Sequence, residues 1–183
     1  NEALFTMSGN SIISGNTAYS RSTSKGGSGG GIWTSKNTKS KFVINGGIIA
    51  ENVASYYGGC VQANSAKTVS EINGGVISGN RANTYYGGGV EADHGGSIKI
   101  TGNTTIAGNY AKTAGGGISV RSTGSSITLD GAKVSVTSNE TAGNGGGAYV
   151  AGTSSLTING AQIVDNIAKN GGGIYSSATL NVN

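Results

Sequence analysis

The feature that most constrains this chain is a glycine triplet followed by an apolar residue, which recurs from one end of the sequence to the other. The six copies occupy residues 29–32, 58–61, 87–90, 115–118, 145–148 and 171–174, and the second copy carries Cys60 as its third residue. Their third positions, 31, 60, 89, 117, 147 and 173, are 26 to 30 residues apart. Such a period predicts a solenoid, because each repeat is one supersecondary unit that cannot bury its apolar face without a neighbour.

Each repeat contains two further apolar patterns besides the triplet. One is a pair of apolar residues two positions apart, such as Phe42 and Ile44, followed by a polar residue and usually by glycine. The other is an aliphatic residue followed three positions later by asparagine, in the six copies 13–16, 49–52, 77–80, 106–109, 136–139 and 163–166. Alternation with a period of two is typical of strands, and glycine allows a turn after them. We expect the asparagine at a corner, where it tolerates left-handed backbone geometry and bonds to nearby backbone.

Three strands and three corners in every 28 to 29 residues predict an all-β protein, a right-handed parallel β-helix of about six coils. A left-handed hexapeptide helix would need shorter coils. Equivalent apolar residues should stack inside as an aliphatic ladder, namely Ile13, Ile49, Ile77, Ile106, Val136 and Ile163. We expect residues 1–183 to form a single β-helix segment of a longer repeat protein, with polar insertion loops near residues 19–28 and 36–41.

Composition excludes several other classes of protein. The chain has 35 glycines but no proline and no Gly-X-Y period, so it is not collagen-like. No apolar run approaches the roughly 20 residues that span a bilayer, and we expect no transmembrane segment in this chain. The single cysteine, Cys60, cannot form an intrachain disulfide and is expected to be a small residue in a tight place. The sequence predicts neither a metal site nor a cofactor.

The glycine triplets and the Ile-x-x-Asn motifs together resemble the Gly-Gly-Ala-aliphatic and Phe-x-x-Asn repeats of the chlamydial polymorphic outer-membrane proteins. They are equally similar to the β-helix repeats of large bacterial surface adhesins. The resemblance covers almost the whole chain, although the third glycine replaces the usual alanine, and Ile or Val replaces Phe. It implies a bacterial protein that is extracellular or displayed on the cell surface, and it implies no catalytic residue.

Aromatic residues are the first candidates for ligand contact. Trp33 occupies the outward position after a glycine triplet, and the pairs Tyr56-Tyr57 and Tyr85-Tyr86 occupy equivalent corners one coil apart. Their rings should therefore stack. Exposed aromatic rows pack on sugar rings or on a partner protein, and they also shield the edge of a rod, so both interpretations remain open.

The only cluster of carboxylates forms a second candidate site. The alternation of the strand points the side chains of Glu91 and Asp93 outward. The register between coils places Arg121 beside Asp93, one coil later. We expect a surface ion pair between Asp93 and Arg121. Contact with a carbohydrate or a cation, and catalysis, are the alternatives. His94, the only histidine, is expected to be an exposed corner residue.

The leading hypothesis is a non-catalytic extracellular stalk or adhesin segment that attaches to a glycan, a host surface protein or a neighbouring copy, with end-to-end self-association as one mode. Basic residues concentrated early in the chain favour polyanionic glycans or a negatively charged cell surface, namely Arg21, Lys25, Lys36, Lys39 and Lys41. No recognition motif accompanies this charge, so we do not expect binding to nucleic acid.

Two alternative functions remain open. The first is a fragment of an enzyme that binds or cleaves a polysaccharide, with Glu91, Asp93 and Arg121 at its centre. The second is an ice-binding protein, because flat β-helices can carry outward threonine rows. Charged residues interrupt the rows of the second strand at Glu71, Lys99 and Asp130, which makes this the weaker alternative.

Overall fold

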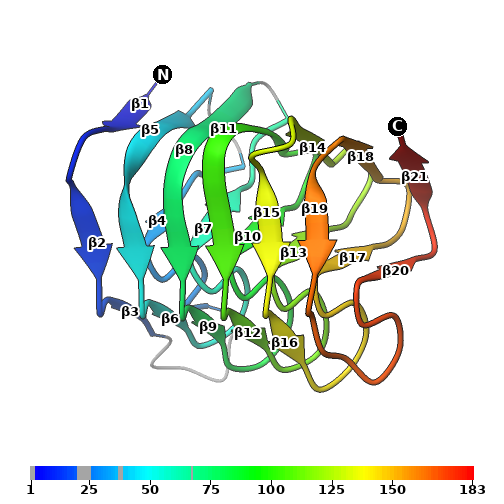
Figure 1. Cartoon of the computed structure of the whole chain (residues 1–183). Helices are drawn as coiled ribbons and strands as arrows, with labels where there is room; N and C mark the ends of the chain where they lie inside the picture. Colours follow the sequence, from blue (N-terminus) through cyan, green and yellow to red (C-terminus); the bar gives the residue numbers. More distant parts are fainter. Residues whose placement is uncertain (1–2, 20–25, 37–38, 67) are drawn as a thin grey trace.

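A computed structural model describes residues 3–19, 26–36, 39–66 and 68–183. The chain forms an all-β, right-handed parallel β-helix in which every coil contributes to three sheets (Figure 1), so the predicted fold class is confirmed. It makes about five turns instead of the predicted six, because six glycine triplets bound only five intervals. The predicted insertion loops lie partly outside the described residues. No helix in the described part of the chain is long and apolar enough to cross a membrane.

All strand pairings within the three sheets are parallel. The ten-stranded sheet contains β1 (Leu4–Met7), β2 (Ile12–Ser14), β5 (Lys41–Ala50), β8 (Val69–Ser78), β11 (Ser97–Ala107), β14 (Ser126–Asp130), β15 (Ser135–Thr137), β18 (Ser155–Asn159), β19 (Gln162–Val164) and β21 (Thr179–Val182). The six-stranded sheet contains β4 (Ile32–Trp33), β7 (Val61–Ala63), β10 (Val90–Ala92), β13 (Ile118–Val120), β17 (Ala148–Val150) and β20 (Ile174–Ser176). The five-stranded sheet contains β3 (Thr17–Ala18), β6 (Val53–Ala54), β9 (Arg81–Ala82), β12 (Tyr110–Ala111) and β16 (Glu140–Thr141).

The aliphatic ladder lies inside the coils as predicted. Ile49 pairs with Ile77, and Ile77 pairs with Ile106, so the same side of each coil is filled by the same type of side chain. These three residues and Val136 are buried, and Ile163 at the last coil is partly buried against the core. Each fully buried aliphatic side chain contributes about 1.5–3 kcal/mol.

The asparagines form a second, polar ladder beside the aliphatic one. In each step, the Nδ2 and the backbone N–H of one asparagine both donate to the Oδ1 of the asparagine in the next coil. The distances from Asn80 to Asn109 Oδ1 are 2.9 and 3.0 Å, and Asn80 Nδ2 also donates to the Ile49 carbonyl at 3.0 Å. Asn80 and Asn109 are fully buried. Each interior amide is therefore satisfied by the neighbouring coils, as a buried polar group must be.

The left-handed corner lies one residue earlier than predicted. The positive φ angles fall on the residue before each asparagine, namely Gly15, Glu51, Gly79, Gly108, Ser138 and Asp165, with values of 54° to 67°. The expectation that asparagine itself adopts this geometry is wrong. Its amide is held inside the coil by the ladder, so the preceding residue makes the turn.

The three positions of the glycine triplet have different physical requirements. The first glycine has a positive φ, for example 63° at Gly87. The second lies against the next coil, so that a Cβ on Gly88 would sit 2.4 Å from the Gly116 carbonyl oxygen. The third has no positive φ, and Cys60 fits there fully buried. The third position is therefore limited by packing space, and burial raises the pKa of the Cys60 thiol well above its usual value.

Replacing Asn109 by Ala should destabilise the protein by at least about 3 kcal/mol, because Asn80 loses the acceptor for two N–H groups. Asn139 Oδ1 and the Ile77 carbonyl also lose the Nδ2 donor of Asn109, while the backbone N–H of residue 109 remains. Urea denaturation measures this change. The matched control is Asn103→Ala, at an exposed position of β11, which should stay within about 0.5 kcal/mol of the parent. Equal midpoints for the two variants would contradict the role of the ladder.

Candidate functional site

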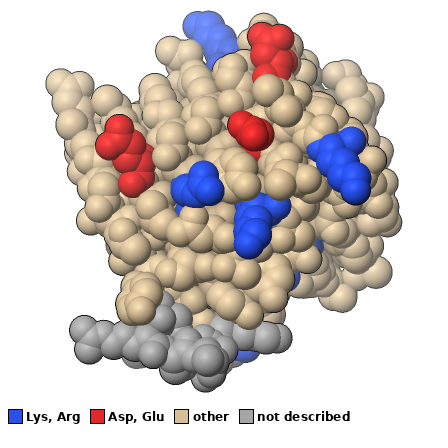
Figure 2. Space-filling view, turned by 90° about the horizontal axis from the view of Figure 1, so that it is seen from below, with Lys and Arg blue, Asp and Glu red and all other residues tan. Residues whose placement is uncertain are grey.

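Charged side chains are sparse on the face of the rod that is seen from below (Figure 2). Figure 2, which views the molecule from below, shows single Lys or Arg and single Asp or Glu side chains separated by uncharged residues. No patch of one sign forms on that face. A candidate site is therefore better sought where side chains of several kinds meet in a hollow.

One cleft, of about 620 Å³, contains several of the predicted site residues. It lies over the outer side of the six-stranded sheet and the turns that follow β4, β7, β10 and β13. It is lined by Ser28, Trp33, Ser35, Lys36, Tyr57, Gln62, Asn64, Asp93, His94, Arg121 and Ser122. Another hollow of about 540 Å³, near Leu4, Lys41 and Glu71, has no aromatic lining and involves no predicted site residue.

The register of the six-stranded sheet brings the cleft residues together. Trp33 pairs with Gln62, Gln62 with Glu91, and Glu91 with Ser119, so one outward row crosses four coils. Neighbouring members of such a row are about 4.8 Å apart along the rod axis. The register predicted around Glu91 is confirmed. Gln62 and Asn64 therefore line the same hollow as Asp93, one coil before it.

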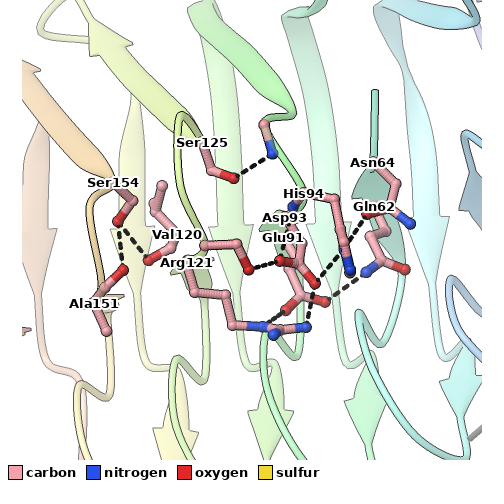
Figure 3. A network of polar contacts seen from close by, with 12 residues as sticks. Gln62, Asn64, Glu91, Asp93, His94, Val120, Arg121, Ser125, Ala151 and Ser154 are labelled. Atoms are coloured by element: carbon pink, nitrogen blue, oxygen red, sulfur yellow. Dashed lines mark hydrogen bonds and ion pairs between the residues drawn. The ribbon is translucent and has the colours of Figure 1, made fainter. Parts of the chain in front are cut away.

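Arg121 binds both carboxylates of the predicted cluster (Figure 3). Its Nε lies 2.7 Å from Glu91 Oε1, and its Nη2 bonds to Asp93 Oδ2. Its Cζ lies 4.5 Å from the ring centroid of Tyr57 and 4.8 Å from that of Tyr86. Glu91 and Asp93 are 0% and 1% exposed. The expected surface ion pair is wrong in this respect, because corner tyrosines and the guanidinium cover side chains that point out of the coil.

Asp93 is also held by the turn that follows it and by a serine of the next coil. The backbone N–H of His94 donates to Asp93 Oδ1 at 2.8 Å, and the Ser122 hydroxyl donates to the same oxygen. His94 Nδ1 lies 3.0 Å from Asp93 Oδ2 and 2.9 Å from Asn64 Oδ1. Both neighbouring oxygens are acceptors, so Nδ1 is the hydrogen-bond donor in these contacts. His94 is half exposed with a φ of 49°, as expected for a corner residue.

Glu91 has a raised pKa, chiefly because its carboxyl group is buried. Burial raises the pKa of Glu91 to about 7, while Arg121 opposes this shift and the charge of Asp93 adds to it. Its Oε2 accepts one hydrogen bond, from Gln62 Nε2 at 3.0 Å. Glu91 therefore exchanges its proton near neutral pH, at a position closed to solvent.

Gln62 has an unusual hydrogen-bonding state in this network. It is 2% exposed, and its Nε2 is committed to Glu91. Its Oε1 is buried without a hydrogen-bond partner. An acceptor left in this state costs about 1–3 kcal/mol. Gln62 is thus a residue of the cleft wall with one unused acceptor.

The corner tyrosines stack as predicted, and the row is longer than predicted. Tyr57 and Tyr86 have ring centroids 6.2 Å apart and planes within 4° of parallel. Tyr86 stacks on Tyr149 at 5.6 Å, and Tyr149 on Tyr175 at 5.7 Å. Tyr86 reaches Tyr149 across one coil, whose corresponding residues Ala114 and Ser119 are small. These rings turn their faces to one another, which favours a structural role for most of the row.

The predicted site residues fall into three groups. Trp33, Tyr57, Asp93 and Arg121 line the cleft. Glu91 lies buried beneath it. The remaining predicted residues belong to the tyrosine stack outside the lining, namely Tyr56, Tyr85 and Tyr86.

Lys36 and His94 line the cleft, although the sequence offered only a basic segment and a corner position for them. Within the described residues, no group of three or more His, Cys, Asp or Glu side chains is arranged to hold a metal ion.

Glu91 should make stability depend on pH. The pKa of Glu91 in the folded state lies above the ordinary value of 4.5, so as pH rises the carboxyl group loses its proton in the unfolded chain before it does so in the folded protein. The free energy of unfolding therefore falls as pH rises from about 4.5 to about 7. Glu91→Gln should remove this part of the slope, because the amide stays neutral. Urea denaturation at several pH values measures it. The control is Glu140→Gln, at an exposed position of β16, and equal slopes for both variants would contradict the assignment.

Comparisons with family models, with curated proteins and with solved structures found no match for this chain. The resemblance to bacterial surface repeats therefore stays an expectation. What the cleft binds has to be inferred from its own residues: an exposed indole, a tyrosine at the end of a stack, and a polar wall of amide, imidazole and guanidinium groups.

Proposed function

We propose that this chain is a non-catalytic β-helical display segment that binds a glycan in the cleft beside Trp33. The observation that carries the proposal is the half-exposed indole facing the same hollow as Gln62 and Asn64. Following the resemblance to surface repeats, we place the protein outside a bacterial cell, where it attaches to a host or neighbouring surface.

The chemistry of the cleft suits a sugar. Trp33 is 50% exposed, and the C–H face of a pyranose ring packs well on such a surface. Amide and imidazole groups around it can exchange hydrogen bonds with hydroxyls. The stacked coils hold these groups on a rigid frame, which lowers the entropy lost on binding.

The carboxylates favour binding over cleavage. Glu91 has no exposed surface, and Arg121 engages both Glu91 and Asp93. A glycosidase needs one carboxyl group within reach of the glycosidic oxygen. Asp93 and His94 do line the cleft, and this observation keeps polysaccharide cleavage as the second candidate function. Ice binding has less support, because charged residues interrupt the outward threonine rows that it needs. Lys99 of β11 and Asp130 of β14 form an ion pair of 3.2 Å there.

Removing the indole should abolish most of the binding. We expect Trp33→Ala to weaken the affinity for glycans that the wild type captures on a glycan array by at least about tenfold, since an aromatic platform contributes on the order of 1–3 kcal/mol. Isothermal titration calorimetry measures the change. Tyr110→Ala is the control, because Tyr110 packs with Arg81 away from the cleft residues. Thermal melting confirms that both variants fold.

Two results would overturn this proposal. One is the absence of binding to any glycan by the wild-type protein. The other is cleavage of a polysaccharide by the wild type that both Glu91→Gln and Asp93→Asn abolish, which would establish the enzymatic alternative.

We also propose that copies associate end to end. In the first coil Leu4 and Ile12 are 62% and 63% exposed, and in the last coil Ile167 and Val182 are 63% and 65% exposed. Within the described residues, β1 and β21 each pair with a strand on one side only, and unpaired edges recruit other strands. Light scattering after size-exclusion chromatography should show a mass that grows with concentration and less growth for Val182→Lys. A monomer at all concentrations would contradict it.

A further inference from the structure

The side-chain oxygen of Gln62 is a hydrogen-bond acceptor without a donor, and a ligand in the cleft could supply that donor. Gln62 Oε1 is buried and has no partner, while its amide nitrogen is fixed on Glu91 at 3.0 Å. While Glu91 is ionised, its carboxylate prevents the amide from rotating its oxygen inward, since two acceptors would then meet. No described residue donates to this oxygen, and a sugar hydroxyl in the cleft is a donor that could satisfy it.

The neighbouring coil places an aromatic surface next to this acceptor. Trp33 pairs directly with Gln62 between the parallel strands β4 and β7, and both residues line the cleft. Side chains at paired positions of parallel strands share one face. A ring lying on the indole would therefore bring its edge hydroxyls to the Gln62 amide.

The charges of the residues around the cleft favour an acidic sugar over a neutral one. Both buried carboxylates are engaged by Arg121. Lys36 lines the same cleft and is exposed, and among the described residues no ion pair involves it. The first fifty residues carry five Lys or Arg and one acidic residue, while the remainder carries seven of each. The protein's net positive charge therefore belongs to the segment that supplies Trp33 and Lys36.

From these observations we infer that the cleft binds an anionic saccharide. Its ring packs on Trp33, a ring hydroxyl donates to Gln62 Oε1, and its carboxylate or sulfate group meets the ammonium of Lys36. This inference rests on the proposed glycan-binding function and names the class of glycan.

The test compares three oligosaccharides by calorimetry: trigalacturonate, a sulfated galactotriose and neutral galactotriose, each at about 50 mM and about 500 mM salt. We expect the wild type to bind one or both acidic probes at least about tenfold more tightly than the neutral one at low salt, with a smaller gap at high salt. The stronger of the two acidic probes identifies the group that Lys36 recognises.

Three variants divide the site into its parts. Lys36→Gln should lower the affinity for the acidic probe to that for galactotriose and remove the salt dependence. Gln62→Leu should weaken acidic and neutral probes alike, by about tenfold, with the salt dependence retained. Lys169→Gln, at an exposed position of the last coil, is the matched control and should change neither.

The outcomes separate this inference from the broader proposal. If acidic and neutral probes bind equally and Lys36→Gln changes nothing, the anionic class is wrong although glycan binding stands. If no glycan binds the wild type at all, the proposed function fails with it. Lys36 is exposed, so its variant reports on binding even where Gln62→Leu disturbs the fold.

Discussion

Hydrogen bonding between successive coils through the buried asparagines is the interaction on which the rest of the structure depends. Each amide accepts two hydrogen bonds from the coil before it, as Asn109 does from Asn80 at 2.9 and 3.0 Å. This spacing is possible only where the backbones approach closely, and a Cβ on Gly88 would lie 2.4 Å from the next coil. The glycine triplets and the asparagine ladder are therefore two aspects of one requirement, and the aliphatic columns fill the space they enclose.

The same stacking converts equivalent repeat positions into continuous rows on the outside. The row after the glycine triplets runs through Trp33, Gln62, Glu91, Ser119, Tyr149 and Tyr175. Large rings in the later coils close into a stack, and polar residues in the earlier coils leave a hollow beside the indole. A repetitive fold thus acquires an individual site by varying one row while its interior stays uniform.

Burial of charge distinguishes this site from the rest of the rod. Glu91 and Asp93 point out of the coil, yet tyrosines and Arg121 cover them. Burial raises the pKa of Glu91 to about 7, and the single guanidinium of Arg121, shared with Asp93, opposes this shift. The network also fixes the Gln62 amide with its oxygen unsatisfied. Stability, protonation and the proposed recognition of a ligand therefore share the same few residues.

The sequence by itself determined the coil, its inward columns and the register between coils, because these follow from local alternation and from the spacing of identical motifs. It placed Gln62 and Arg121 on either side of Glu91 correctly. Only the tertiary structure decided that the carboxylates are buried, that the residue before each asparagine makes the turn, and that Tyr86 meets Tyr149 across a coil. These features depend on how side chains from different coils pack against one another. The pattern within a single repeat does not encode this packing.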